Sequence, residues 1–279
     1  LQIDQQRAAR DVGGGVVLIV ADDAAEDLFE RAGPQAGLAG GLGRDAAHGG
    51  GRERQVDAAE RAAGIERNLV FSTATTPHQV ADINDFIHEK CLKYPAFIGL
   101  GTLHPAMEGA DEEIERIRAL GLHGVKLHPD FQEFCIDDER MLPVYRRLAD
   151  CRLPVLIHMG DRRYDWSAPE RLARVLERVP ELRVIAAHFG GYGVWDEAAR
   201  VLAGSQAYFD TSSTLPFLPA GHVRRLIGLL GADRLFFGTD CPMWDIREEI
   251  GRFLALGLPE EDNRKILAEN FLRAFPEMI

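Results

Sequence analysis

From about residue 65 onward, short apolar runs alternate with amphipathic segments at a nearly constant interval. The runs are Leu69–Phe71, Ala96–Leu100, Gly124–Leu127, Pro154–Ile157, Val184–Ala187, Ala207–Phe209 and Leu235–Phe237. Polar residues at or near the ends of these runs are separated by 31, 24, 30, 30, 22 and 30 residues, at Thr73, His104, His128, His158, His188, Asp210 and Asp240. This interval is about the length of one strand–helix unit, so the pattern predicts a parallel sheet.

The number of units favours a closed barrel. Apolar residues recur at helical spacing in 111–120, 169–178 and 222–230, and Gly or Pro follows these segments. No Gly-rich dinucleotide-binding turn follows any of the strands, and seven units leave room for one more in front of them. There VVLIV (16–20) is typical of a strand and 23–32 of a helix, while 259–275 is expected to be a closing helix. We therefore predict one (β/α)8 TIM-type barrel domain over residues 1–279 rather than a doubly wound sheet.

The composition excludes several classes of protein. Lys and Arg number 32 against 44 Asp and Glu, which gives a net charge of −12 and argues against nucleic-acid binding. No apolar run approaches the roughly 18 residues of a membrane span. The four cysteines are scattered and form no CxxC pair, which favours a reducing compartment, with the cytoplasm as the default. We expect a small-molecule substrate, and the sequence leaves homo-oligomerisation open.

The polar residues at the strand ends are suited to metal chemistry. In a (β/α) barrel the carboxyl ends of the strands surround one pocket, so residues far apart in sequence meet there. Histidine and aspartate are ligands of cations such as Zn²⁺ in sites that keep one position for water. Such a cation lowers the pKa of the bound water, which can then attack a carbonyl group, and a nearby aspartate can accept the proton.

Six motifs give this pattern a specific resemblance. They are GVKLHPDF (124–131), LPVLIHMGD (153–161), VIAAHFGG (184–191), YFDTSS (208–213), LFFGTDCPMW (235–244) and ILAENFLRAF (266–275). In this order they resemble the amidohydrolase-related (amidohydrolase 2 type) family, the metal-dependent hydrolase and decarboxylase branch of the amidohydrolase superfamily. The resemblance extends from about Ala63 to the C-terminus, so we expect residues 65–279 to form the family-like barrel.

The resemblance implies roles for individual residues. His158 is expected to bind the metal, His188 to bind the metal or polarise the substrate, and Asp240 to bind the metal and act as general base. Lys126 and His128 lie two apart on one strand, so they share a face, and one of them is expected to point into the pocket. Further candidates are Asp210, Ser212 and Ser213 for supporting hydrogen bonds, Arg162 and Tyr164 for gripping a substrate carboxylate, and Trp244 for lining the pocket.

The N-terminal segment departs from the family. Members begin with a His-x-His pair that supplies two further ligands, but residues 1–60 contain neither this pair nor the Glu-x-Ala of some decarboxylases. This segment is rich in Ala and Gly, has no Lys, and has one aromatic residue, Phe29. A reading-frame error or a recombined start accounts for the change; replacement of a ligand by Asp22 or Asp23 is the alternative. We expect substoichiometric zinc.

Three functions follow from the resemblance. The first is hydrolysis of a C–N or C–O bond in a small organic substrate by metal-activated water. The second is metal-dependent, non-oxidative decarboxylation at the same site. The third is a catalytically impaired barrel that lacks the His-x-His ligands. The ligand types favour zinc modestly, with manganese and iron as alternatives.

Overall fold

The computed structural model describes residues 15–18 and 65–279, and its strands are short and parallel. They are β1 (Gly15–Leu18), β2 (Ile65–Val70), β3 (Phe97–Gly99), β4 (Gly101–Thr102), β5 (Val125–Leu127), β6 (Val155–Ile157), β7 (Val184–Ala186), β8 (Tyr208–Asp210) and β9 (Leu235–Phe236).

The strands follow one another around a closed barrel. Their order is β1-β2-β3 in one sheet and β4-β5-β6-β7-β8-β9 in the other. Only Leu100 separates β3 from β4, so these two strands are halves of one barrel strand and the two sheets continue into each other. Contacts between β1 and β9 close the ring. This arrangement confirms the predicted (β/α)8 class, with eight strand positions and strictly sequential pairing.

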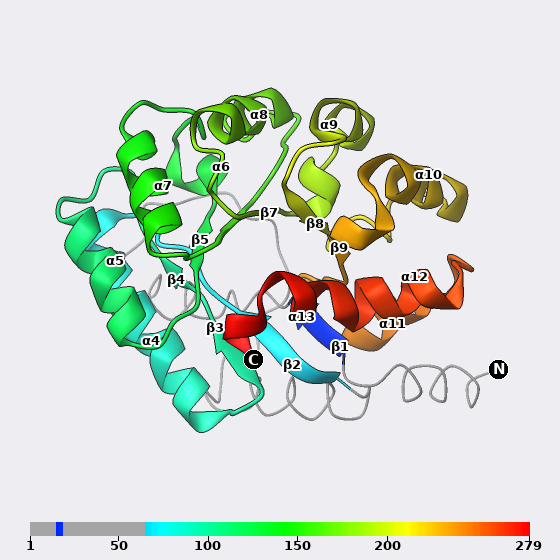
Figure 1. Ribbon diagram of the computed structural model, residues 1–279, viewed down its shortest axis with the longest axis horizontal. Coiled ribbons are helices and arrows are strands. Elements are labelled where there is room, and N and C mark those ends of the chain that lie inside the picture. Colours follow the sequence, from blue (N-terminus) through cyan, green and yellow to red (C-terminus); the bar gives the residue numbers. More distant parts are fainter. Residues whose placement is uncertain (1–14, 19–64) are drawn as a thin grey trace, which may run out of the picture.

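The helices surround the strands (Figure 1). The α-helices are α4 (Val80–Lys93), α5 (Ala110–Ala119), α6 (Pro129–Gln132), α7 (Met141–Asp150), α8 (Pro169–Arg178), α9 (Trp195–Leu202), α10 (Ala220–Leu230), α11 (Ile246–Leu254), α12 (Glu260–Arg264) and α13 (Asn270–Ala274). Shorter turns are η1 (Pro77–Gln79), η2 (His188–Gly190), η3 (Ala232–Arg234), the π-helical η4 (Lys265–Glu269) and η5 (Pro276–Met278).

The three amphipathic segments 111–120, 169–178 and 222–230 coincide with α5, α8 and α10. The predicted strand at 16–20 overlaps β1, whereas the predicted helix at 23–32 lies outside the described residues. The closing segment 259–275 contains three consecutive helical pieces, α12, η4 and α13, instead of one helix. None of the described helices is long and apolar enough to cross a membrane.

Alternate strand residues serve two different cores. Val155 and Ile157 of β6 join a cluster between the strands and the helices, while Leu156 joins a second cluster inside the barrel. This follows from the period of two along a strand. Burial on both faces explains why the strands are continuous apolar runs.

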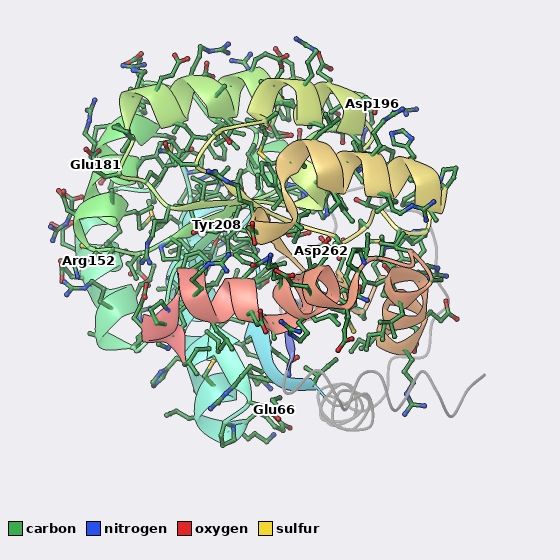
Figure 2. The ribbon with its side chains drawn as sticks, turned by 45° about the vertical axis from the view of Figure 1, so that its right-hand side comes forward. Glu66, Arg152, Glu181, Asp196, Tyr208 and Asp262 are labelled. Carbon is green, nitrogen blue, oxygen red and sulfur yellow. The ribbon has the colours of Figure 1, made fainter. Side chains whose placement is uncertain are left out.

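The C-terminal segment closes one end of the barrel interior. Phe271, Phe275 and Met278 belong to the inner cluster. The Phe275 ring lies 5.6 Å from that of Tyr208, the first residue of β8, so this segment covers the amino ends of the strands. Figure 2 shows Tyr208 near the middle of the molecule, just above the C-terminal helices in this view, with Arg152, Glu181 and Asp196 at the periphery. Among the described residues, this segment therefore covers the amino-terminal end of the barrel interior.

Candidate metal centre

His158 and His188 lie at the carboxyl ends of two adjacent strands, β6 and β7. Nδ1 of His158 is 3.0 Å from Nε2 of His188, and the two rings meet at 67°. Two imidazole nitrogens that face each other at this distance and angle are placed to share a proton or one cation. The structure thus brings together the two imidazoles that the sequence proposed as ligands.

Ser212 fixes the tautomer of His188. Nδ1 of His188 lies 3.0 Å from the carbonyl oxygen of Ser212 and 2.9 Å from its Oγ. A carbonyl oxygen only accepts hydrogen bonds, so Nδ1 carries the proton. In the neutral ring Nε2 therefore presents a lone pair towards His158, the orientation that a metal ligand needs.

Asp210 at the end of β8 stabilises this arrangement by accepting hydrogen bonds. Its Oδ1 accepts hydrogen bonds from the backbone amides of His188, at 3.1 Å, and Ser212, at 2.9 Å, and from the Ser212 hydroxyl. All three residues are buried. Asp210 and Ser212 therefore provide the supporting hydrogen bonds expected from their place after the strand.

Asp240 follows β9 and is attached to the same network through Ser213. The Ser213 hydroxyl donates to Asp240 Oδ2 at 2.5 Å and accepts the indole N–H of Trp244 at 3.0 Å. Ser213 follows Ser212 directly, so neighbouring serines hold His188 and Asp240. Trp244 is half-buried and packs edge-on against Phe217, with 5.5 Å between ring centres, and its expected role in lining the pocket stays a prediction.

Several residues of this site have backbone conformations that L-amino acids rarely adopt. His188, Ser213 and Asp240 have φ values of 60°, 46° and 57°. Such conformations cost about 1–3 kcal/mol each and persist where the surrounding structure enforces them. All three residues lie shortly after the strands β7, β8 and β9, where the chain leaves the barrel wall.

Lys126 is the inward-facing charged residue of β5. Its neighbours Val125 and Leu127 belong to the outer core, and its Nζ lies 5.1 Å from the ring centre of Phe71, an inner-cluster residue. The side chain is buried, with 4% of the residue exposed. His128, two residues later, follows the strand and stacks against His158 at 3.8 Å between ring centres. His128 therefore lies beside the imidazole pair, and Lys126 lies close enough for its charge to act on His128 and His158.

His128, Asp130 and His158 form a second cluster of possible ligands. Within residues 65–279 these three side chains place one ligand atom each within 4.8 Å of the others, whereas His158, His188 and Asp240 do not satisfy this spacing as a set. The rings of His128 and His158 are nearly parallel, at 11°. The lone pair of an imidazole nitrogen lies in the plane of its ring, so a cation cannot lie in the planes of both stacked rings at once, and this geometry is poor for joint ligation by His128 and His158.

Burial and charge determine the protonation of this cluster. Desolvation, followed by the charges of Lys126 and neighbouring imidazoles, holds the pKa of His128 and that of His158 well below 6.5. Both rings are therefore neutral at pH 7, as metal ligands must be. Desolvation raises the pKa of Asp130 to about 6, partly offset by the hydroxyl of Ser167.

The donor chemistry of the imidazole pair suits a divalent cation. The lone pair of His188 Nε2 faces Nδ1 of the neutral His158, and Asp240, two strands further along the barrel after β9, is the third candidate donor. Two imidazoles and one carboxylate are also the protein ligands of many catalytic zinc sites. The segment 1–60, where the family has its His-x-His pair, lies outside the described residues apart from β1.

The loop after β6 carries Arg162 and Tyr164, which lie at the exposed rim. The guanidinium of Arg162 donates to the carbonyl oxygen of Gly193 at 2.9 Å. Tyr164 stacks on Trp166 at 4.5 Å and is 46% exposed. The structure therefore gives each of these side chains an intraprotein contact, and their role in gripping a substrate carboxylate stays a prediction.

Asp130 and Ser167 are site residues that the sequence reasoning missed. Ser167 Oγ donates to Asp130 Oδ2 at 2.5 Å, and Asp130 Oδ1 is buried without a hydrogen-bond partner. The signal was present in the HPD sequence after β5, where Asp130 follows a strand-end histidine by two residues. No sequence pattern indicated Ser167, because it lies in a loop 37 residues after Asp130.

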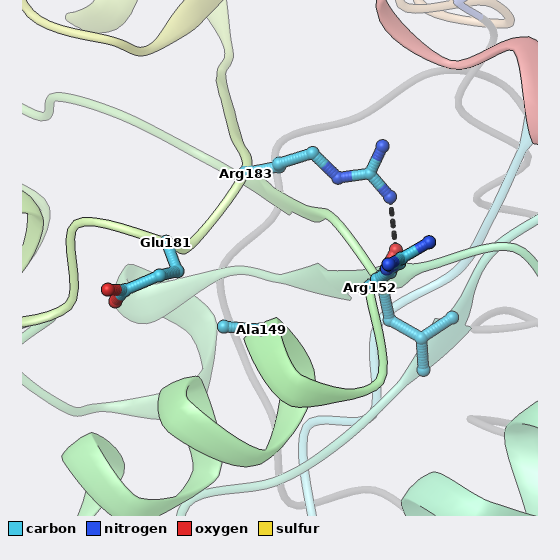
Figure 3. Close-up of a pocket in the computed structure, with 5 residues that line it drawn as sticks. Ala149, Arg152, Glu181 and Arg183 are labelled. Atoms are coloured by element: carbon cyan, nitrogen blue, oxygen red, sulfur yellow. Dashed lines mark hydrogen bonds between the residues drawn. The ribbon is translucent and has the colours of Figure 1, made fainter.

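A separate cavity of about 320 Å³ lies at the opposite end of the barrel, before β6 and β7. It is lined by Ala149, Arg152, Leu153, Glu181 and Arg183. Figure 3 shows the guanidinium of Arg183 directed at the carbonyl oxygen of Arg152, to which it donates a hydrogen bond. In TIM barrels this end serves stability rather than catalysis, so we place the functional site at the carboxyl ends of the strands.

Comparison with known proteins agrees with the fold and with the motifs. The chain is similar to 5-carboxyvanillate decarboxylase from Novosphingobium aromaticivorans complexed with manganese, with 17% identity, a TM-score of 0.73 and coverage of 95% of this chain and 96% of that chain. It is also similar to 2,6-dihydroxybenzoate decarboxylase from Rhizobium, with 20% identity, a TM-score of 0.69 and coverage of 95% of this chain and 99% of that chain. A third similar structure is a probable 2-pyrone-4,6-dicarboxylic acid hydrolase from Acinetobacter baumannii, with 15% identity, a TM-score of 0.62 and coverage of 80% of this chain and 88% of that chain.

The protein has the architecture of the TIM-barrel enzymes, with histidines and an aspartate at the carboxyl ends of its strands. Residues 33–276 match the model of the amidohydrolase family, and the chain belongs to this family. The structural neighbours include decarboxylases and a hydrolase of similar fold.

Proposed function

We propose that this protein is a metal-dependent decarboxylase of a small aromatic carboxylate, with His158, His188 and Asp240 holding a divalent cation. The observation that carries the proposal is the His158–His188 pair, with 3.0 Å between nitrogens, beside the buried cationic side chain of Lys126. Neutral imidazoles suit a cation, while the lysine suits a negatively charged substrate. Two solved neighbours are named as decarboxylases of aromatic acids.

The walls of the site suit an aromatic ring. Tyr192, Trp195, Phe217 and Trp244 pack edge to face or stacked against one another, with ring centres 5.5 to 6.3 Å apart. Phe217 is 48% exposed, so this aromatic group has an accessible face. Planar aromatic substrates pack well on such surfaces, because ring pairs add favourable contacts beyond simple area burial.

The chemistry requires one proton to replace carbon dioxide. A carboxylate R–COO⁻ takes up H⁺ at the carbon that bears it, the C–C bond breaks, and R–H and CO₂ leave. In this proposal Asp240 moves the proton, and the hydrogen bond from the Ser213 hydroxyl to its Oδ2 supports that role. Lys126 orients the substrate carboxylate, and the aromatic wall excludes water from the ring. The bound cation supplies Lewis-acid polarisation of substrate oxygens.

The ligand types suit zinc, as the sequence suggested, and manganese is the ion named in one neighbour. All four cysteines of the chain are free thiols, which supports a reducing compartment such as the cytoplasm.

Hydrolysis of a C–N or C–O bond is the second candidate. It needs the same ligands, with Asp240 accepting a proton from an activated water. The observation that favours it is the structural likeness to a protein named as a probable hydrolase of a dicarboxylic acid.

An assay that separates gas release from bond hydrolysis tests both candidates. Protein loaded with Zn²⁺ or Mn²⁺ is incubated with hydroxybenzoates and with esters, lactones and amides of similar size. Release of CO₂ from a hydroxybenzoate, absent after chelation and absent in Asp240→Asn, is the expected result. Ester, lactone or amide cleavage without CO₂ release would support hydrolysis, and metal-independent turnover would contradict both candidates.

A further inference from the structure

Asp130 has no assigned role, yet it is the carboxylate nearest the far nitrogen of the proposed ligand His158. Its Oδ2 lies 3.9 Å from His158 Nε2, on the side of the ring opposite the nitrogen that faces His188. The Asp130 side chain is 2% exposed, and its Oδ1 is buried without a hydrogen-bond partner. A buried carboxylate with spare acceptor capacity beside an imidazole is placed to receive an N–H.

The tautomer of His188 imposes a constraint on His158. Because His188 Nε2 carries a lone pair, the hydrogen bond between the rings requires a proton on His158 Nδ1 in the metal-free protein. A cation between the rings needs lone pairs on both nitrogens. The neutral His158 ring must then carry its proton on Nε2, the nitrogen that faces Asp130.

We propose that Asp130 is the positioning residue of this site, and that it accepts a hydrogen bond from Nε2–H of His158 when a cation occupies the space between His158 and His188. This inference rests on the proposed function, because it assumes that these two histidines are ligands. A carboxylate that accepts the second N–H of a ligating histidine fixes the ring's tautomer and orientation and increases its basicity.

The surroundings of Asp130 favour this role. Ser167 holds Oδ2 at 2.5 Å, so the carboxylate is already oriented. The His128 ring covers one face of His158, with 11° between planes, so His158 can approach Asp130 within its own plane without losing this stacking contact. Closing the gap from 3.9 Å to hydrogen-bond length requires a displacement of about 1 Å.

Metal titration of the full chain tests the inference. Co²⁺ affinity, followed by d–d absorption, is compared among wild type, Asp130→Asn, Asp130→Ala and the control Asp138→Asn. Asp138 is a carboxylate of the same β5–α7 connection, and it pairs with Arg140. We expect Asp130→Asn and Asp130→Ala to bind Co²⁺ about 10- to 100-fold more weakly and the control to stay within about 2-fold. Circular dichroism confirms that the variants are folded.

A second measurement tests the inference in the wild-type protein and so does not depend on the folding of the Asp130 variants. In Zn²⁺-loaded wild type, nitrogen-15 NMR reports which nitrogen of His158 is protonated, with the signal assigned by His158→Gln. Protonation at Nε2 supports the inference, and coordination through Nε2 would overturn it. Unchanged Co²⁺ affinity in Asp130→Asn would overturn it while the proposed function stands.

Two further outcomes separate the alternatives. If His188→Ala keeps its Co²⁺ affinity while His128→Ala loses it, the cation lies among His128, Asp130 and His158. Asp130 is then a ligand rather than a positioning residue, and the inference is wrong. If the wild type binds neither Co²⁺ nor Zn²⁺, the proposed function and the inference both fail.

Discussion

The hydroxyl of Ser213 donates a 2.5 Å hydrogen bond to the carboxylate of Asp240, and both residues have left-handed backbone conformations. Hydrogen bonds to charged groups contribute about 1.5–3 kcal/mol, which corresponds to roughly 10- to 100-fold in rate. We expect Ser213→Ala to lower kcat by this factor in the CO₂-release assay. Ser205→Ala, at a surface loop before β8, is the control and should leave kcat unchanged. Equal rates for both variants would remove Ser213 from the mechanism.

Asp240 is the residue that we expect to carry the proton. Asp240→Asn keeps the shape of the side chain but cannot take up and return a proton at pH 7. General acid–base catalysis contributes about 10²- to 10⁴-fold to a rate, so kcat should fall by at least about 100-fold. Asp262→Asn, on α12, is a matched control away from the site. Turnover within 2-fold of wild type in Asp240→Asn would show that another group moves the proton.

Gly160, three residues after the end of β6, has a φ of 79° and almost no space for a side chain. A Cβ there would lie 2.5 Å from the backbone nitrogen of Tyr192. Gly204 has nearly the same φ, 78°, but nothing within 4 Å of the Cβ position. We expect Gly160→Ala to cost at least ~2 kcal/mol of unfolding free energy and Gly204→Ala ~1 kcal/mol. Thermal unfolding of both variants measures the difference, and equal costs would contradict the tight packing at Gly160.

Asp130 makes stability depend on pH in the metal-free protein. Because its pKa is about 6 when folded against an ordinary 3.8, the folded state binds this proton more tightly than the unfolded state. This contribution, up to ~3 kcal/mol, is complete below pH 3.8 and is lost as pH rises through 6. We expect the free energy of unfolding in urea to fall more steeply between pH 4 and 7 in wild type than in Asp130→Asn. Identical slopes would contradict the raised pKa.

The missing His-x-His pair affects how much metal the protein retains. Three ligands without that pair hold a cation less tightly than the complete family set, so we expect purified protein to contain less than one equivalent of zinc. Added Zn²⁺ or Mn²⁺ should restore occupancy and activity, and a chelator should remove both. Metal analysis by mass spectrometry after gel filtration checks this. A full equivalent that survives dialysis against chelator would show that other residues complete the site.

The sequence by itself determined the fold class and the strand ends at which the candidate ligands lie. The polar residues that follow the apolar runs recur at intervals of 22 to 31 residues, which predicts sequential βα units. The barrel follows because parallel strands must be covered on both faces. His158, His188 and Asp240 were predictable because they end three such runs. Their positions depend on local periodicity, which the chain carries in its order of residues.

Only the tertiary structure decided which of these residues touch and how each is oriented. The 3.0 Å contact between His158 and His188, the tautomer set by Ser212, and the link from Ser213 to Asp240 depend on side-chain directions at the ends of different strands. Asp130 and Ser167, 37 residues apart, meet because β5 and β6 are neighbours in the barrel. Such contacts depend on distances across the fold, which periodicity along the chain does not contain.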